Sequence, residues 1–176
     1  MKVALSLFTF LITILLCSFR QSAPDPDINA KTKTLFIYNF TKYVEWPESM
    51  KTGSFVIGIY GDYPNLLAEL QNMASTKTAG SQKITIIQYS SVETIVPCHL
   101  IYVNEDKAGE LPGIIKKLGD YPTLVVTDAE GSAKKGACIN FYYEASKQRM
   151  EVNPETIRKR DLKISGQLLS LAKVVQ

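Results

Sequence analysis

The sequence has few of the residues from which catalytic and metal sites are built. It contains one histidine and three cysteines in 176 residues, whereas a structural zinc site takes about four Cys or His ligands at close spacing. The phosphate-binding patterns G-x-x-x-x-G-K and G-x-G-x-x-G are absent, and so is the nucleophile pattern G-x-S-x-G. The chain therefore lacks the sequence signs of a zinc enzyme, a nucleotide-binding loop or a serine hydrolase.

Strong net charge is also missing. The first 23 residues contain Lys2 and Arg20 and no acids, so residues 24–176 carry 18 basic and 17 acidic side chains. A net charge near +1 gives no general attraction to nucleic acid or to anionic lipid. We therefore expect no nucleic-acid partner.

An apolar run stands at the start of the chain. Residues 3–17 are uncharged and follow Lys2, and polar sequence with prolines comes after them. This pattern predicts a secretory signal peptide over residues 1–23, with Ala23 as one candidate cleavage site. The run is short for a membrane-spanning helix, which needs about 20 apolar residues. An uncleaved anchor and lipidation at Cys17 are the two alternatives, and in each case the protein is exported.

The rest of the chain has the length and apolar content of one domain, which we assign to residues 31–176. We expect residues 24–30, between the signal peptide and the domain, to be a disordered linker. The apolar run at 55–60 contains no charge, which suits a strand covered on both faces. Gly61 allows a turn after it, and Pro64 suits the first position of a helix. This strand, turn and helix are the start of a βαβ fold.

Strand and helix patterns then alternate along the chain. The predicted strands after the first are 83–89, 98–103, 123–127 and an antiparallel pair at 137–144 and 149–152, and the predicted helices are 31–45, 64–73 and 111–118. Asn153-Pro154 starts a long C-terminal helix with a weak point at Gly166. Alternation of this kind predicts an α/β fold. We expect a three-layer, flavodoxin-like or Rossmann-like sandwich with a mostly parallel sheet in the order 2-1-3-4-5, ending in a C-terminal antiparallel hairpin strand.

This strand order bears on the two cysteines of the domain. Cys98 and Cys138 lie on strands with another strand between them. Two strand spacings are about 10 Å, whereas a disulfide needs Cα atoms within about 7 Å, so we predict two free thiols and no disulfide.

His99 lies inside an apolar strand, which predicts a core residue. Trp46, before Pro47, either fills the core at the end of the first helix or forms part of a pocket or partner surface.

Polar residues follow several of the predicted parallel strands. Asp62 and Tyr63 follow the first strand and Asp128 follows the fourth. Ligands bind at this edge in open α/β sheets, so these residues are candidate ligand contacts, while solvated turn and helix-cap roles are the plainer explanation. Without a recognisable catalytic residue or metal site, we favour a binding or regulatory module over an enzyme at this edge, and we expect no cofactor.

Five segments, in this order and spacing, resemble the YfiR-like family. They are residues 40–47, 55–61, 98–102, 139–141 and 153–169. The resemblance covers roughly residues 31–175, and it is specific as an ordered set. It implies a periplasmic α/β protein without catalytic residues, often a homodimer. Its best-understood members restrain a membrane-bound diguanylate cyclase by binding its periplasmic part, which lowers cyclic di-GMP and reduces biofilm and exopolysaccharide.

The resemblance favours one function over two others. We expect a homodimer that binds the periplasmic domain of a membrane signalling protein, such as a diguanylate cyclase, and we place the partner or dimer surface at Trp46, Pro47, Leu168 and Leu171. The alternatives are a periplasmic small-molecule sensor that uses the polar strand ends, and an enzyme at the same edge. Members often contain intrachain disulfides, but the first strand here has no thiol, so the resemblance gives Cys98 no obvious partner.

Overall fold

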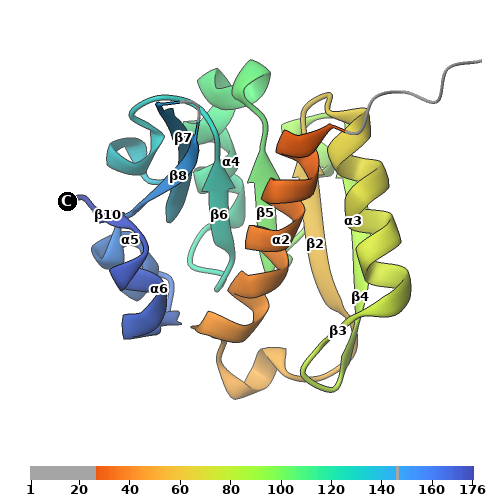
Figure 1. Cartoon of the computed structure of the whole chain (residues 1–176). Helices are drawn as coiled ribbons and strands as arrows, with labels where there is room; N and C mark the ends of the chain where they lie inside the picture. The colour runs from red at the N-terminus through yellow and green to blue at the C-terminus, as the bar shows by residue number, and fades with distance from the viewer. Residues whose placement is uncertain (1–26, 146) are drawn as a thin grey trace, which may run out of the picture.

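The computed structural model describes residues 27–145 and 147–176, so the predicted signal peptide lies outside the described residues. Strand β2 (Phe55–Tyr60) lies inside an eight-stranded sheet (Figure 1). It pairs in parallel with β4 (Gln82–Tyr89) on one side and with β5 (Leu100–Val103) on the other. An uncharged apolar run is what a strand in this position requires, because five of its six residues are buried and both of its neighbours are strands.

The sheet has the order β10-β8-β7-β6-β5-β2-β4-β3. Its five strands β4-β2-β5-β6-β7 are parallel and follow the 2-1-3-4-5 order predicted from the sequence. Strands β6 (Leu124–Thr127), β7 (Ile139–Glu144) and β8 (Lys147–Val152) continue the sheet, and β7 and β8 form the predicted antiparallel hairpin. The two-residue strands β3 (Thr78–Ala79) and β10 (Lys173–Val174) lie at the edges. The prediction of an α/β fold with a mostly parallel sheet is confirmed.

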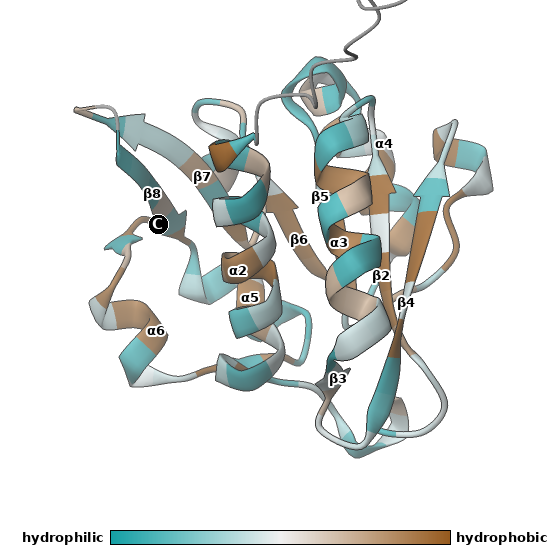
Figure 2. Ribbon diagram, turned by 45° about the vertical axis from the view of Figure 1, so that its right-hand side comes forward, coloured by the Kyte–Doolittle hydropathy of each residue, from teal (hydrophilic) through white to brown (hydrophobic). Residues whose placement is uncertain are grey.

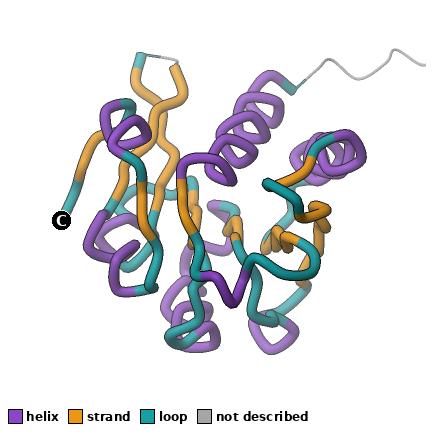
Figure 3. Tube along the Cα trace, turned by 90° about the horizontal axis from the view of Figure 1, so that it is seen from below, coloured by secondary structure: helices purple, strands orange, loops and turns teal. Residues whose placement is uncertain are grey.

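Helices lie on both faces of the sheet. In Figure 1, α2 (Ile28–Tyr43) and α3 (Pro64–Thr76) lie in front of the strands, and α4 (Leu111–Leu118) lies behind them; Figure 3 shows the same arrangement from below. Strands β5 and β6 are buried at every residue, and their hydrophobic colour in Figure 2 marks the centre of the core. Because β4, β2, β5, β6 and β7 are parallel, their carboxyl ends lie at the same edge of the sheet.

Helix α2 begins three residues earlier than the periodicity predicts. Asp27 is its N-cap, and its side chain accepts a hydrogen bond from the Ala30 backbone N–H over 3.0 Å. Residues 28–30, which we assigned to the disordered linker, are therefore helical. The helix also ends earlier than predicted, because Val44–Glu45 forms the short strand β1, which pairs with β9 (Lys163–Ile164).

The prediction of one long C-terminal helix is wrong. The helix α5 (Pro154–Lys159) ends before Asp161, whose φ of 54° lies in the left-handed region and breaks the helical path. A new helix, α6 (Gly166–Ser170), then begins at its own N-cap, where the Ser165 hydroxyl accepts from the Leu168 backbone N–H over 3.2 Å. The prediction failed because the same apolar pattern also arises when separate short elements each place apolar residues, such as Leu168, in the core.

Both cysteines of the described chain are buried and free. Cys98 lies just before β5 and Cys138 just before β7, with β6 between these strands. Burial raises the pKa of Cys98 to about 12 and that of Cys138 to about 11, so both thiols stay protonated at neutral pH. Of the helices within residues 27–145 and 147–176, none is long and apolar enough to cross a bilayer.

Candidate functional site

A buried ion pair joins α2 to the end of the sheet. The Lys33 ammonium donates to Asp128 Oδ2 over 2.6 Å, and the two side chains are only 6% and 8% exposed. The Tyr102 hydroxyl also donates to Asp128 Oδ2. The Lys33 ammonium lies 4.9 Å from the centre of the Tyr63 ring, which suits a cation–π contact. We call these four residues the rim network, and they connect the first helix to three strand ends.

The electrostatics of the rim network keep its tyrosines protonated. Burial, together with the Asp128 carboxylate, raises the pKa of Tyr102. Burial and the nearby Asp27 carboxylate raise the pKa of Tyr63. A charge buried without a partner is strongly unfavourable, so Lys33 and Asp128 require each other. The network therefore holds helix α2 against the ends of the strands.

The three residues predicted as a ligand edge do not form one site. Tyr63 and Asp128 belong to the rim network through Lys33. Asp62 is exposed and lines a separate hollow of about 430 Å³, with Asp106 among its neighbours. Asp128 borders a different hollow of about 670 Å³.

Sequence reasoning missed Lys33, although the sequence contains a signal for it. Lys33 lies four and seven residues before Ile37 and Phe40, so it shares their buried face of α2. A lysine in an otherwise apolar stripe needs a buried counter-charge. The acids at the strand ends were the candidates for that role, and Asp128 fills it.

His99 lies at the opposite edge of the sheet, where the strands begin. Its Nδ1 accepts from the Val56 backbone N–H over 3.0 Å, and its Nε2 lies 2.8 Å from the Met50 carbonyl oxygen, to which it donates. Both ring nitrogens are thus satisfied by the neutral tautomer with its proton on Nε2. Burial lowers the pKa of His99. The prediction of a core residue is confirmed.

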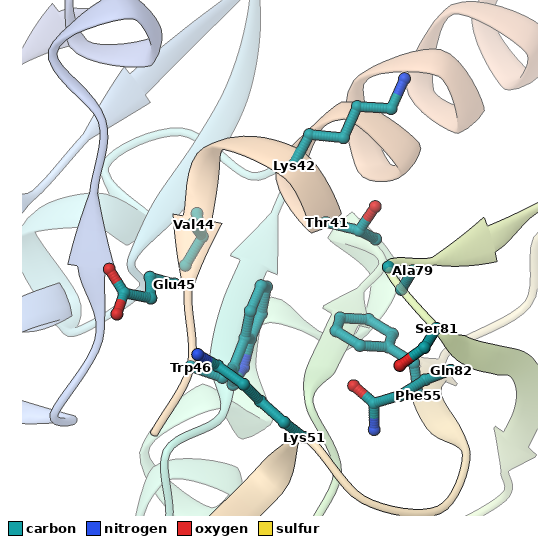
Figure 4. A pocket seen from close by; sticks show the side chains of 11 residues that line it. Thr41, Lys42, Val44, Glu45, Trp46, Lys51, Phe55, Ala79, Ser81 and Gln82 are labelled. Atoms are coloured by element: carbon teal, nitrogen blue, oxygen red, sulfur yellow. The ribbon is translucent and has the colours of Figure 1, made fainter. Parts of the chain in front are cut away.

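Trp46 packs beside this histidine. Its Nε1 donates to the His99 carbonyl oxygen over 3.0 Å, and its ring meets Phe55 edge-on at 4.9 Å between centroids. Trp46 is 6% exposed, so it fills the core at the end of the first helix, as one of the two roles considered for it requires. Trp46 and Phe55 also line a hollow of about 400 Å³, shown in Figure 4, whose other lining residues include Lys42 and Lys51.

The buried neutral His99 predicts a loss of stability in mild acid. An unfolded histidine titrates near pH 6.5, and the folded pKa is lower, so the unfolded state takes up the proton first as the pH falls. The contribution of His99 to stability is therefore complete above about pH 6.5 and is lost below it, toward the folded pKa. We expect a lower urea midpoint at about pH 5.5 than at about pH 7.5.

The control for this experiment is His99→Gln. Because the sequence has one histidine, this variant removes the only side chain with an ordinary pKa in that range. Its urea midpoint should change much less between the two pH values, even if it is lower at both. An equal pH dependence in the variant and the wild type would show that His99 is not the cause.

Two of the four predicted partner-surface residues are not at the surface. Trp46 and Leu168 are buried in the core, and Pro47 is half-buried. Leu171 is 62% exposed. The reason is that α6 is a separate short helix, which turns Leu168 inward and leaves Leu171 at its C-terminal end outward.

Within the described part of the chain, no three His, Cys, Asp or Glu side chains are grouped to hold a metal ion.

A family model described as YfiR/HmsC-like matches residues 30–173. The chain belongs to the YfiR/HmsC-like family. This confirms the resemblance found in the sequence. The family is known for periplasmic regulators of diguanylate cyclases. No curated protein matches the chain.

Solved structures share the fold of this YfiR/HmsC-like protein at low identity. A conserved domain protein from Vibrio cholerae O1 biovar El Tor is 14% identical, with a TM-score of 0.61 over 84% of this chain and 60% of that chain. An ABC domain from Streptococcus pneumonia, solved in complex with L-Trp, is 11% identical, with a TM-score of 0.56 over 83% of this chain and 60% of that chain. The YfiR/HmsC-like chain therefore spans about 60% of each of these chains, and the likeness extends to the fold alone.

Proposed function

We propose that this protein is a non-catalytic periplasmic regulator, which binds the periplasmic part of a membrane-bound diguanylate cyclase and holds it in a less active state. The family match over residues 30–173 carries the proposal. Restraint requires only that the regulator binds one state of the cyclase more tightly than the other, and ordinary coupling of this kind is about 1–3 kcal/mol. Lower cyclic di-GMP output and less biofilm follow.

An apolar patch near the C-terminus supports a contact surface. Leu171 and Val174 are both large, exposed apolar side chains, three residues apart. Val174 lies on β10, an edge strand that pairs with Glu151 and Val152 of β8. Exposed apolar side chains beside a sheet edge are typical of protein interfaces. We propose this C-terminal patch, Leu171 and Val174, as the partner or homodimer surface in place of Trp46 and Leu168.

Leu171→Asp should weaken binding to the cyclase's periplasmic domain by about tenfold or more, because a carboxylate in an apolar contact must lose its hydration. The matched control is Leu35→Asp, since Leu35 is 64% exposed but lies on α2, away from the C-terminus. Both variants should unfold within about 0.5 kcal/mol of the wild type. Isothermal titration with the purified periplasmic domain measures the affinity, and equal affinities for the two variants would overturn the patch assignment.

Crosslinking in intact cells tests the partner class. A photo-crosslinking residue at position 171 should capture a membrane-bound diguanylate cyclase, whereas the same residue at position 35 should capture much less of it. A band of twice the protomer mass from position 171 would place the homodimer contact at the patch, and light scattering on the purified protein measures the dimer independently. Capture that contains no membrane signalling protein would contradict the proposed function.

A further inference from the structure

The hollow of about 400 Å³ beside Trp46 lies where strands β2 and β4 begin, next to their first residues Phe55 and Gln82 (Figure 4). Its other walls are the C-terminal end of α2, strand β1 and the turn between β3 and β4. We call it the Trp46 hollow. Its volume is within the range of about 300–1,000 Å³ that small-molecule sites occupy. Its lining residues belong neither to the rim network nor to the C-terminal patch.

One buried side chain at this hollow has an acceptor without a donor. Gln82 is 8% exposed. Its Nε2 donates over 2.9, 3.2 and 3.4 Å to the backbone carbonyl oxygens of Met50, Thr52 and Gly53. Because carbonyl oxygens surround this atom, it must be the nitrogen of the amide, and the other atom must be the oxygen. This oxygen, Oε1, accepts no hydrogen bond from residues 27–145 and 147–176.

The free oxygen of Gln82 can be reached from the hollow. Gln82 lines the hollow, and in Figure 4 its oxygen lies on the side of Trp46 while its nitrogen is turned away. The oxygen keeps contact with solvent, because the fully buried side-chain atoms that lack a partner in the described chain belong to other residues, namely Thr34, Asp128, Asn140 and Gln148. A reachable acceptor on a side chain that is otherwise buried and fixed favours a ligand with an N–H or O–H donor at this point.

Beside this acceptor the wall of the hollow is apolar. It contains Val44, Trp46, Phe55 and Ala79, which all belong to the core. The Trp46 indole N–H already donates to the His99 carbonyl oxygen, so the ring offers apolar contact alone. Side chains that the core holds in place lose little further freedom when a ligand binds. This part of the wall suits a branched apolar group.

A lysine supplies the charge at this hollow. Lys51 lines the hollow, and its ammonium pairs with Glu48, whose side chain is 86% exposed. An exposed ion pair contributes little to stability, so the ammonium is available to a carboxylate of a ligand. The other two charged lining residues, Lys42 and Glu45, point away from the hollow in Figure 4. The charge that a ligand meets is therefore positive.

An acceptor, an apolar wall and a cation together describe one class of ligand. We propose that the Trp46 hollow binds an N-acylated apolar amino acid, either free or as the last residue of a short peptide. The amide N–H donates to Gln82 Oε1, the apolar side chain lies against the apolar wall, and the carboxylate pairs with the Lys51 ammonium. The site is independent of the proposed cyclase partner, so either can fail while the other holds.

A series of small probes tests each part of this site on the mature protein. N-acetyl-L-leucine carries all three groups, 4-methylpentanoate lacks the N–H, N-acetyl-L-leucinamide lacks the charge, and N-acetylglycine lacks the side chain. N-acetyl-L-leucine should raise the melting temperature with saturation. Isothermal titration should show each of the other three binding about fivefold or more weakly. Gly-Gly-L-leucine separates the two sources, because tighter binding than N-acetyl-L-leucine indicates a peptide end and weaker binding indicates the free acylated amino acid.

Lys51→Gln assigns the binding to this hollow. Lys51 is exposed, so the variant should keep its fold. It should bind N-acetyl-L-leucine about fivefold more weakly and N-acetyl-L-leucinamide as the wild type does, so that the preference for the charged ligand disappears. Lys83→Gln is the matched control, because Lys83 is also exposed and follows Gln82 directly but does not line the hollow. This control should keep both affinities.

Ser81→Trp tests the position of the site independently of charge. Ser81 is exposed between β3 and β4 and lines the hollow, so a large side chain there takes the space of the ligand from the solvent side. The variant should bind N-acetyl-L-leucine about tenfold or more weakly, because bound ligand and indole ring cannot occupy the same volume. Gln82 itself is left unchanged, since its Nε2 holds residues 50–53.

Lys51→Gln decides the question if Ser81→Trp fails to fold. The absence of a saturable effect of N-acetyl-L-leucine up to about 20 mM would overturn the proposal, because the hollow would then hold water alone. Equal affinities for N-acetyl-L-leucine and 4-methylpentanoate would also overturn it, because Gln82 Oε1 would then meet no donor. The same holds for a preference for the charged ligand that persists in Lys51→Gln.

Discussion

Lys33→Met is expected to destabilise the protein by about 3–5 kcal/mol, because it leaves the Asp128 carboxylate buried without its counter-charge. The loss should be similar at low and moderate salt, since solvent screens a buried pair only weakly. Urea unfolding followed by circular dichroism measures the difference. Adding Asp128→Asn to Lys33→Met should recover a large part of the loss, because the neutral amide still offers Tyr102 an acceptor.

The matched control for this prediction is Lys159→Met. Lys159 pairs with Glu155 over 2.8 Å, but the two side chains are 72% and 51% exposed, and exposed pairs contribute about 0–1 kcal/mol. The two variants thus remove the same charge with opposite burial. A cost of less than about 1 kcal/mol for Lys33→Met would mean that the rim network does not hold α2 to the sheet.

Gly61→Ala is expected to cost about 2–4 kcal/mol, for two reasons that act together. The φ of Gly61 is 111°, which an L-residue adopts with strain. An added Cβ would also lie 2.6 Å from Asp106 Oδ1 and 2.7 Å from Asn104 Cβ, so the loop after β5 would have to move. Gly53→Ala is the control for a positive φ without crowding, because its φ is 71° and nothing lies within 4 Å of the added Cβ; its backbone strain is smaller, since 71° is close to the left-handed region that L-residues adopt.

The Gly61 contact also shows how the loop after β5 packs against the end of β2, beside the hollow of about 430 Å³ that Asp62 and Asp106 line. The strand order reverses between β2 and β5, and open α/β sheets bind ligands at the carboxyl ends of such strands. Here the Asn104 N–H donates to the Tyr60 carbonyl oxygen over 2.9 Å, and the Asn104 and Asp106 side chains pack against Gly61. A cost for Gly61→Ala no larger than that for Gly53→Ala would show that neither this packing nor the larger φ of Gly61 contributes much.

The parallel sheet could be predicted because its strands are buried on both faces. Residues 55–60, 100–103 and 124–127 are apolar almost throughout, and turn or helix-start residues such as Gly61 and Pro64 follow the first of them. The apolar residues within each segment are enough to identify it as a buried strand. The right-handed crossover rule then leaves few possible orders, and the order 2-1-3-4-5 is the one in the structure.

The candidate site was less predictable because it depends on contacts distant in the sequence. Lys33 and Asp128 are 95 positions apart, and nothing local tells which acid at the strand ends receives the lysine. The burial of Trp46 and Leu168 likewise depends on where short elements pack in the fold. The periodicity of the sequence indicates only which residues share one face of a helix. The break at Asp161 was missed because a non-glycine residue in the left-handed region has no firm sequence sign.

The measurement that tests the central claim most directly is the cellular cyclic di-GMP level after deletion of the gene. The proposed restraint predicts that deletion raises cyclic di-GMP and biofilm, that the wild-type gene restores both, and that Leu35→Asp restores them while Leu171→Asp does not. Levels that stay unchanged on deletion, across several growth conditions, would contradict control of a diguanylate cyclase by this protein.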